Sequence, residues 1–147
     1  MGSFNTRFFK NNRSTIVEGI AILPEFQGKG IFRSMIGQVR CGNEYLCLRT
    51  QNPRMYRALS NFCENIYPNG RDTPEHIITI REEFAKSLNC NIDGNGVVKG
   101  YYGGLFYGIE PHHNKVDSLF RELGINLNKG DALLVIGEIK FDWADVI

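Results

Sequence analysis

The stretch from Thr15 to Leu23 constrains the fold most, because it predicts a β-strand that is apolar on both faces. Its apolar side chains alternate, with Ile16, Ile20 and Ile22 on one face and Val17, Ala21 and Leu23 on the other. Glu18 is the one ionisable residue in this stretch. A strand of this kind is typical of a sheet covered on both sides, which is the usual setting of parallel strands, and Pro24 ends it.

A glycine turn and an amphipathic helix follow this strand. Gly28 and Gly30 lie in the turn. Apolar residues then recur at helical spacing, at Ile31, Phe32, Met35, Ile36 and Val39. The N-terminus of a helix presents unpaired amide groups, and glycines let a ligand approach the backbone closely. Such a junction can bind phosphate, although glycine turns are common and this one also fits a plain tight turn.

The rest of the sequence alternates predicted strands and helices. We expect strands at about residues 4–10, 44–49, 97–107 and 132–141, and helices at about 53–63, 72–89 and 114–123. Asn52 is a preferred N-cap residue and Pro53 is favoured at the first helical position, so one helix start is well marked. A strand, helix and strand in series imply a right-handed crossover, so the strands at 15–23 and 44–49 should be parallel.

Composition bounds the class of protein. The chain of 147 residues has 42% hydrophobic and 22% charged residues and a formal charge of +1. These values indicate one globular domain over residues 1–147 and no nucleic-acid partner. No apolar run approaches the ~20 residues of a membrane span, so we expect no membrane partner. The cysteines lack a C-x-x-C pair and indicate reduced thiols in a cytoplasmic protein.

The segment from Val17 to Ile31 resembles the acyl-CoA-binding motif of the GNAT N-acetyltransferase superfamily, whose loop follows the pattern Gln/Arg-x-x-Gly-x-Gly/Ala. Gln27 and Gly30 fit the pattern, whereas Phe32 stands where the family usually has Gly or Ala. The similarity also covers the strand 45–49 and the start of the helix after it. It implies an α/β (α+β) fold with a GNAT-like mixed central sheet flanked by helices.

The N-terminal part of that family fold is short here, because only residues 1–14 precede the apolar strand. The family places several strands and helices before this strand, and they help to form the acceptor site. Three explanations compete: a truncated or mis-started gene, a fold completed by exchange between two copies in a homodimer, and a reduced form that no longer catalyses.

The resemblance implies acetyl-CoA as cosubstrate and direct transfer of its acetyl group to a primary amine of a small molecule or a protein. In the family, the two parallel strands splay apart after the glycine loop and the pantetheine arm lies between them. A backbone N–H of the first strand would polarise the thioester carbonyl, and the loop amides would hold the pyrophosphate. The implied cofactor-binding positions are Ile20, Ile22, Leu23, Gln27, Gly28, Lys29, Gly30, Ile31, Phe32, Arg33 and Asn52. Lys29 and Arg33 either add charge there or are solvated.

Glu18 is the candidate general base, since the family's base often lies on this strand and on this face. Burial in an apolar strand would shift the protonation equilibrium of its carboxyl group toward neutral pH. A Glu18 paired with a buried arginine is the structural alternative. The leaving thiolate needs an acid, in many relatives a tyrosine one or two turns into the helix that begins here at Pro53. Counting from Asn52 gives Leu59, so the nearby Tyr56 is the candidate acid, with core packing as its alternative.

Two alternatives to a transferase stay open: a non-catalytic acyl-CoA-binding or interaction module, and a small α/β domain whose glycine turn binds nothing. We expect no metal site, because His112 and His113 are adjacent ligands that alone do not make a tetrahedral set. The aromatic residues Tyr101, Tyr102, Phe106 and Tyr107 either wall an acceptor pocket or belong to the core of a strand.

Overall fold

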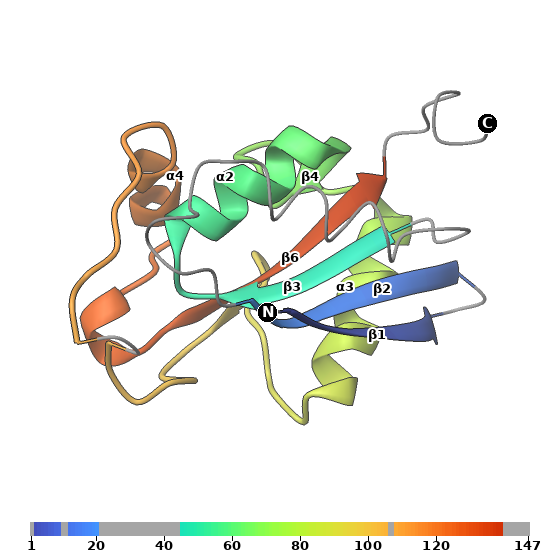
Figure 1. Cartoon of the computed structure of the whole chain (residues 1–147), viewed down its shortest axis with the longest axis horizontal. Helices are drawn as coiled ribbons and strands as arrows, with labels where there is room; N and C mark the ends of the chain where they lie inside the picture. The colour runs from blue at the N-terminus through green and yellow to red at the C-terminus, as the bar shows by residue number, and fades with distance from the viewer. Residues whose placement is uncertain (1, 10–11, 21–44, 106–107, 140–147) are drawn as a thin grey trace.

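The computed structural model describes residues 2–9, 12–20, 45–105 and 108–139. Within them, one mixed sheet has the strand order β1-β2-β3-β6-β4, and the short β5 also pairs with β6 (Figure 1). The strands are β1 Gly2–Phe9, β2 Asn12–Ile20, β3 Tyr45–Thr50, β4 Cys63–Tyr67, β5 Val97–Val98 and β6 Ala132–Ile139. The helices are α2 Pro53–Phe62, α3 Glu75–Ser87 and α4 Asp117–Glu122, with a 3-10 turn η2 at Leu127–Lys129. The mixed α/β class predicted from the sequence is confirmed.

The centre of the sheet is the parallel pair β2 and β3, whose paired positions run from Ser14 opposite Tyr45 to Val17 opposite Leu48. This confirms the parallel arrangement predicted from the strand, helix and strand series. The other neighbouring strands are antiparallel, including the hairpin formed by β1 and β2. The predicted strand at 4–10 is therefore present as the first half of that hairpin.

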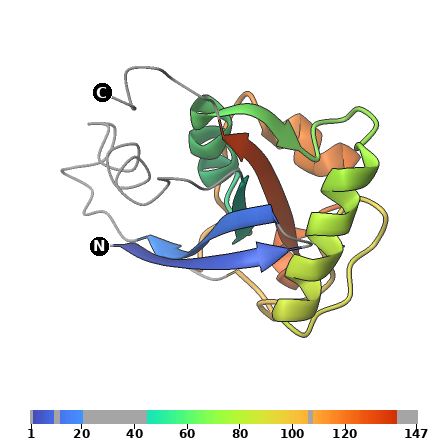
Figure 2. The same ribbon diagram turned by 90° about the vertical axis from the view of Figure 1, so that its right-hand side faces the viewer.

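Helices cover both faces of the sheet, as the apolar pattern of β2 predicts. Val17 belongs to a buried cluster with Leu48 and with Leu59 of α2. Ile16 points to the opposite face, into a cluster with Phe84 of α3. Figure 2 shows α3 on one side of the sheet and α2 on the other. β2 also pairs with β1 along one side and with β3 along the other, so it lies inside the sheet rather than at its edge.

The start of α2 follows its sequence signals. The Asn52 side chain accepts a hydrogen bond from the Arg54 amide at 2.9 Å, and Pro53 occupies the first helical position. The helix ends one residue before its predicted end, because Cys63 is extended (φ −100°, ψ 151°) and begins β4. The strand β4 was not predicted from the sequence.

The predicted strand at 97–107 is present at its first two residues and wrong over residues 99–105, and its last two residues lie outside the described part of the chain. Only Val97 and Val98 pair with β6. The chain then turns at Gly100 and Gly103, which have φ of 66° and 72°, a left-handed conformation that favours glycine. The helices α3 and α4 are shorter than the predicted ranges 72–89 and 114–123 but lie within them. None of the described helices combines the length and the apolar character needed to cross a membrane.

Candidate functional site

Most of the predicted cofactor loop lies outside the described residues. This applies to Ile22, Leu23, Gln27, Gly28, Lys29, Gly30, Ile31, Phe32 and Arg33. The structure describes Ile20, at the end of β2, and Asn52, at the start of α2. The predicted helix that follows this loop also lies outside the described residues, so the site is built from the described ends of β2 and β3.

The parallel ladder between β2 and β3 ends before either strand does. Its last pair is Val17 with Leu48, whereas β2 continues to Ile20 and β3 to Thr50. The pairing of β2 with β1 is irregular at the same level, because Ser3 pairs with Gly19 and Phe4 with Val17. Glu18 is thus the extra residue of a β-bulge, a feature that redirects side chains and is frequent beside active sites.

Glu18 lines a pocket of about 220 Å³ between the sheet and the C-terminal end of α3. Arg7 of β1 and Arg49 of β3 also line it, and Ile16, Phe84 and Leu88 supply apolar wall. Two guanidinium groups and one carboxylate therefore surround a small, partly apolar space. The expectation that Glu18 is buried is wrong: its side chain is exposed, since the bulge places it at the mouth of this pocket.

Arg49 is held in a fixed position by two tyrosines from the segment after β5. Its Nε donates to the Tyr102 hydroxyl at 3.2 Å and its Nη1 donates to the Tyr101 hydroxyl at 2.8 Å. The guanidinium also lies 4.7 Å from the centre of the Tyr101 ring, within the range of a cation–π interaction. Burial alone lowers the pKa of Arg49, but the two tyrosine oxygens outweigh it and raise the pKa. Arg49 is therefore a permanent cation.

Tyr56, the candidate acid, lies on the other face of the sheet from this pocket. Its hydroxyl donates to the Pro68 carbonyl at 2.6 Å, and its ring packs edge-on against Phe120 of α4 at 6.1 Å. Burial raises the pKa of Tyr56 to about 12. The structure thus does not bring Tyr56 and Glu18 together, and it shows the core position that was the alternative.

Asn52 uses its side-chain oxygen to cap α2, and its own amide donates to the Thr50 hydroxyl at 2.9 Å. The preceding Gln51 is buried and ties β3 to distant loops, because its Nε2 donates to the carbonyls of Gly104 at 3.1 Å and Leu127 at 3.0 Å. These bonds fix the end of β3, close in sequence to Arg49, which lines the pocket.

Sequence reasoning missed Arg7 and Arg49 as site residues. The available signal was the alternation in β3, where Tyr45, Cys47 and Arg49 share the face that Ile16 occupies in β2. A charged residue at the end of an otherwise apolar face indicates a polar site beyond it.

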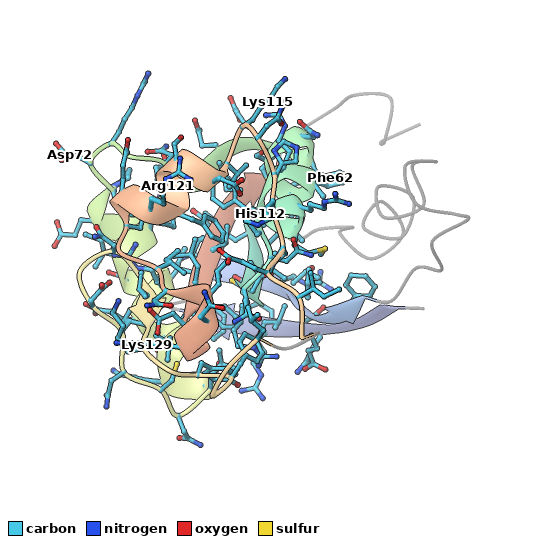
Figure 3. The ribbon with its side chains drawn as sticks, turned by 90° about the vertical axis from the view of Figure 1, so that its left-hand side faces the viewer. Phe62, Asp72, His112, Lys115, Arg121 and Lys129 are labelled. Atoms are coloured by element: carbon cyan, nitrogen blue, oxygen red, sulfur yellow. The ribbon has the colours of Figure 1, made fainter. Side chains whose placement is uncertain are left out.

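The histidine pair makes a local contact on another part of the surface. The His112 ring lies 3.5 Å from the Asp117 carboxylate, and its carbonyl accepts a hydrogen bond from Arg54 at 3.1 Å, beside α2 (Figure 3). Within residues 2–9, 12–20, 45–105 and 108–139, no group of three or more histidine, cysteine or acidic side chains could hold a metal ion.

Comparisons with protein-family models, curated proteins and solved structures give no match to this chain. Its function is therefore inferred from its own residues and their geometry.

Proposed function

We propose that this chain is an N-acetyltransferase of GNAT type that transfers the acetyl group of acetyl-CoA to a primary amine. The observation that carries the proposal is the position of Glu18. It sits in a bulge of β2, one residue beyond the last pair of the parallel ladder and at the mouth of a pocket. The strand continues from there toward the glycine motif, whose resemblance to the acyl-CoA-binding loop supplies the cosubstrate.

The geometry supports direct transfer. The ladder between β2 and β3 has its last pair at Val17 and Leu48, and β2 continues beyond it to Ile20. A backbone N–H near Ile20 would donate to the thioester oxygen as it gains negative charge. The Glu18 carboxylate would take a proton from the ammonium group of the acceptor, directly or through water, because its exposed side chain reaches both pocket and solvent. The neutral amine would then attack the thioester carbon, so that the C–N bond forms as the C–S bond breaks. The thiolate of CoA leaves, and the nitrogen loses its second proton to the thiolate or to water to give the amide.

The acid step is not assigned to Tyr56. Its hydroxyl is already donated to Pro68 inside the core, and its pKa of about 12 makes it a weak acid. A CoA thiolate has a thiol pKa near ~8.5 and can take its proton from water. The core position of the Tyr56 hydroxyl also favours a second candidate, a non-catalytic acyl-CoA-binding module that keeps the cofactor half of the fold.

Thermal unfolding with acetyl-CoA tests the binding half of the proposal. A ligand at a hundred times its dissociation constant adds about 2.7 kcal/mol to the free energy of unfolding. Gly30→Val should abolish this gain, because a branched side chain blocks the approach of the pyrophosphate to the backbone. No stabilisation of the unmodified chain would exclude both candidates. Stabilisation without amine-dependent release of CoA would leave the binding module.

A further inference from the structure

We propose that the pocket beside Glu18 binds a small amine that also carries a carboxylate, of the amino-acid class, and that Arg49 and Arg7 hold this carboxylate. The inference rests on the proposed function in one respect only, because that function makes this molecule the acetyl acceptor. The recognition itself follows from the charges, the hydrogen bonds and the size of the pocket.

Neither pocket arginine has an acidic partner among the described residues. In the part of the chain that the structure describes, neither Arg7 nor Arg49 forms an ion pair with a carboxylate. Arg49 is half-buried between β3 and the tyrosines, and both of its hydrogen bonds go to neutral phenols. Withdrawing a guanidinium from water without a counter-ion is unfavourable, and an anionic ligand in the pocket would compensate for it.

Arg49 is also preorganised to bind an anion. Tyr102 accepts a hydrogen bond from Nε and Tyr101 accepts one from Nη1, which leaves Nη2 without a hydrogen bond in the described structure. The two rings meet edge to face at 5.1 Å, which limits the movement of both. Little side-chain entropy would then be lost when the ligand binds.

The size of the pocket and the signs of its charged groups select the class of ligand. Its volume of about 220 Å³ is below the ~300 Å³ at which sites for drug-sized ligands begin, so a small metabolite fits best. Two guanidinium groups that can bind a carboxylate and the Glu18 carboxylate, which attracts an ammonium group, line the same space. Because groups of both signs face one small space, the complementary ligand is a zwitterion.

The experiment measures binding to the full chain, without acetyl-CoA, by calorimetric titration. The probes are the proteinogenic amino acids, each paired with its amide, in which the carboxylate is neutral and the amine is kept. The variants are Arg49→Gln and Arg7→Gln. The matched control is Arg71→Gln, which removes an exposed arginine in the turn before α3. Arg7 is also exposed, so its substitution should not disturb folding.

We expect at least one amino acid to bind, its amide to bind at least about tenfold more weakly, and each pocket variant to lose at least about tenfold in affinity. The control should bind as the unmodified chain does. Amides that bind as well as acids, pocket variants that bind normally, or no binding by any amino acid would each overturn the proposal. If the amino acid binds through its carboxylate but acetyl-CoA does not stabilise the chain and no CoA is released, the proposed transferase function is wrong and the proposed pocket is kept. If CoA is released equally fast with simple alkylamines, the transferase function is kept and the proposed specificity for a carboxylate is wrong.

Discussion

The guanidinium of Arg49 and the hydroxyl of Tyr101 are joined by a 2.8 Å hydrogen bond across 52 positions of the sequence. This bond connects the central strand β3 to the turn-rich segment after β5. It therefore links the position of a charged group in the pocket to a part of the chain with little regular structure.

Replacing Tyr101 and Tyr102 together by phenylalanine should release Arg49 while keeping both rings. Because Tyr101 is about one-third exposed, at 36%, the free energy of unfolding should fall by only about 1 kcal/mol or less. Amino-acid binding should weaken about tenfold, since the guanidinium is no longer oriented. Urea unfolding and calorimetric titration separate the two effects, and unchanged binding would show that Arg49 needs no support.

Gly130 should be essential to the position of the tyrosine segment, residues 100–104, which carries Tyr101 and Tyr102. It has φ of 81°, its carbonyl accepts the Tyr102 amide at 2.9 Å, and an added Cβ would collide with the backbone of Gly103 and Gly104. Gly130→Ala should therefore cost at least about 1–2 kcal/mol of stability and also weaken the pocket.

Gly94→Ala is the matched control for this substitution, because a Cβ there meets nothing within 4 Å. Its free energy of unfolding should stay within about 0.5 kcal/mol of the unmodified chain. Equal stability of the two alanine variants would show that the tyrosine segment is not packed on Gly130.

Asp131 connects the segment after β5 to the segment before η2. Its buried carboxylate accepts from the amides of Asn126 at 2.8 Å and Gly100 at 2.9 Å, and from Lys99 Nζ at 3.1 Å. Burial alone raises the pKa of Asp131, but these hydrogen bonds and the Lys99 charge outweigh it and lower the pKa. Asp131→Ala should cost about 2–4 kcal/mol in urea unfolding at neutral pH, because two backbone donors lose their acceptor.

The pH dependence of Asp131 follows from that lowered pKa. A carboxylate with a depressed folded pKa stabilises the fold above its unfolded value of ~3.9 and loses this contribution as the pH falls through the folded value. The difference in stability between the unmodified chain and Asp131→Ala should therefore shrink below about pH 4. Asp72→Ala, at an exposed position that points away from the body of the protein (Figure 3), is the control. Its free energy of unfolding at neutral pH should stay within about 0.5 kcal/mol of the unmodified chain.

The raised pKa of Tyr56 predicts the opposite pH dependence of stability. Its folded pKa of about 12 exceeds the unfolded value of ~10, so its contribution is present below pH ~10 and is lost as the pH rises toward the folded value. Tyr56→Phe should cost about 1–2 kcal/mol by leaving the Pro68 carbonyl unpaired, and should flatten the alkaline loss of stability. The Tyr56→Phe variant should transfer the acetyl group at an unchanged rate, and a large loss of rate would show that Tyr56 takes part in the mechanism.

The centre of the sheet could be predicted from the sequence because β2 is apolar on both faces and Asn52 and Pro53 mark the start of α2. The strand β4 could not. Its Glu64 and Asn65 are both exposed, so it lacks the alternation of a buried strand, and the apolar spacing of α2 runs on into Cys63. Its pairing with β6 is supplied by residues about seventy positions later, such as Gly137 opposite Ile66.

Of the three charged residues that line the pocket, Glu18 could be predicted as a site residue from the sequence, whereas Arg7 and Arg49 could not. Glu18 stands out as the one charge in an apolar strand, but its exposure depends on a bulge that no local pattern reveals. Arg49 has no distinctive neighbours in sequence, because the tyrosines that hold it come from the segment after β5. Its role became visible only when these elements were placed together.

The most direct test of the account is the rate of CoA release from acetyl-CoA by the unmodified chain and by Glu18→Gln, measured at neutral pH with an amine acceptor. If Glu18 is the base, Glu18→Gln should lower the rate by about 100-fold or more while leaving the affinity for acetyl-CoA nearly intact. No amine-dependent release by the unmodified chain, or a Glu18→Gln variant that is as fast, would contradict the proposed mechanism.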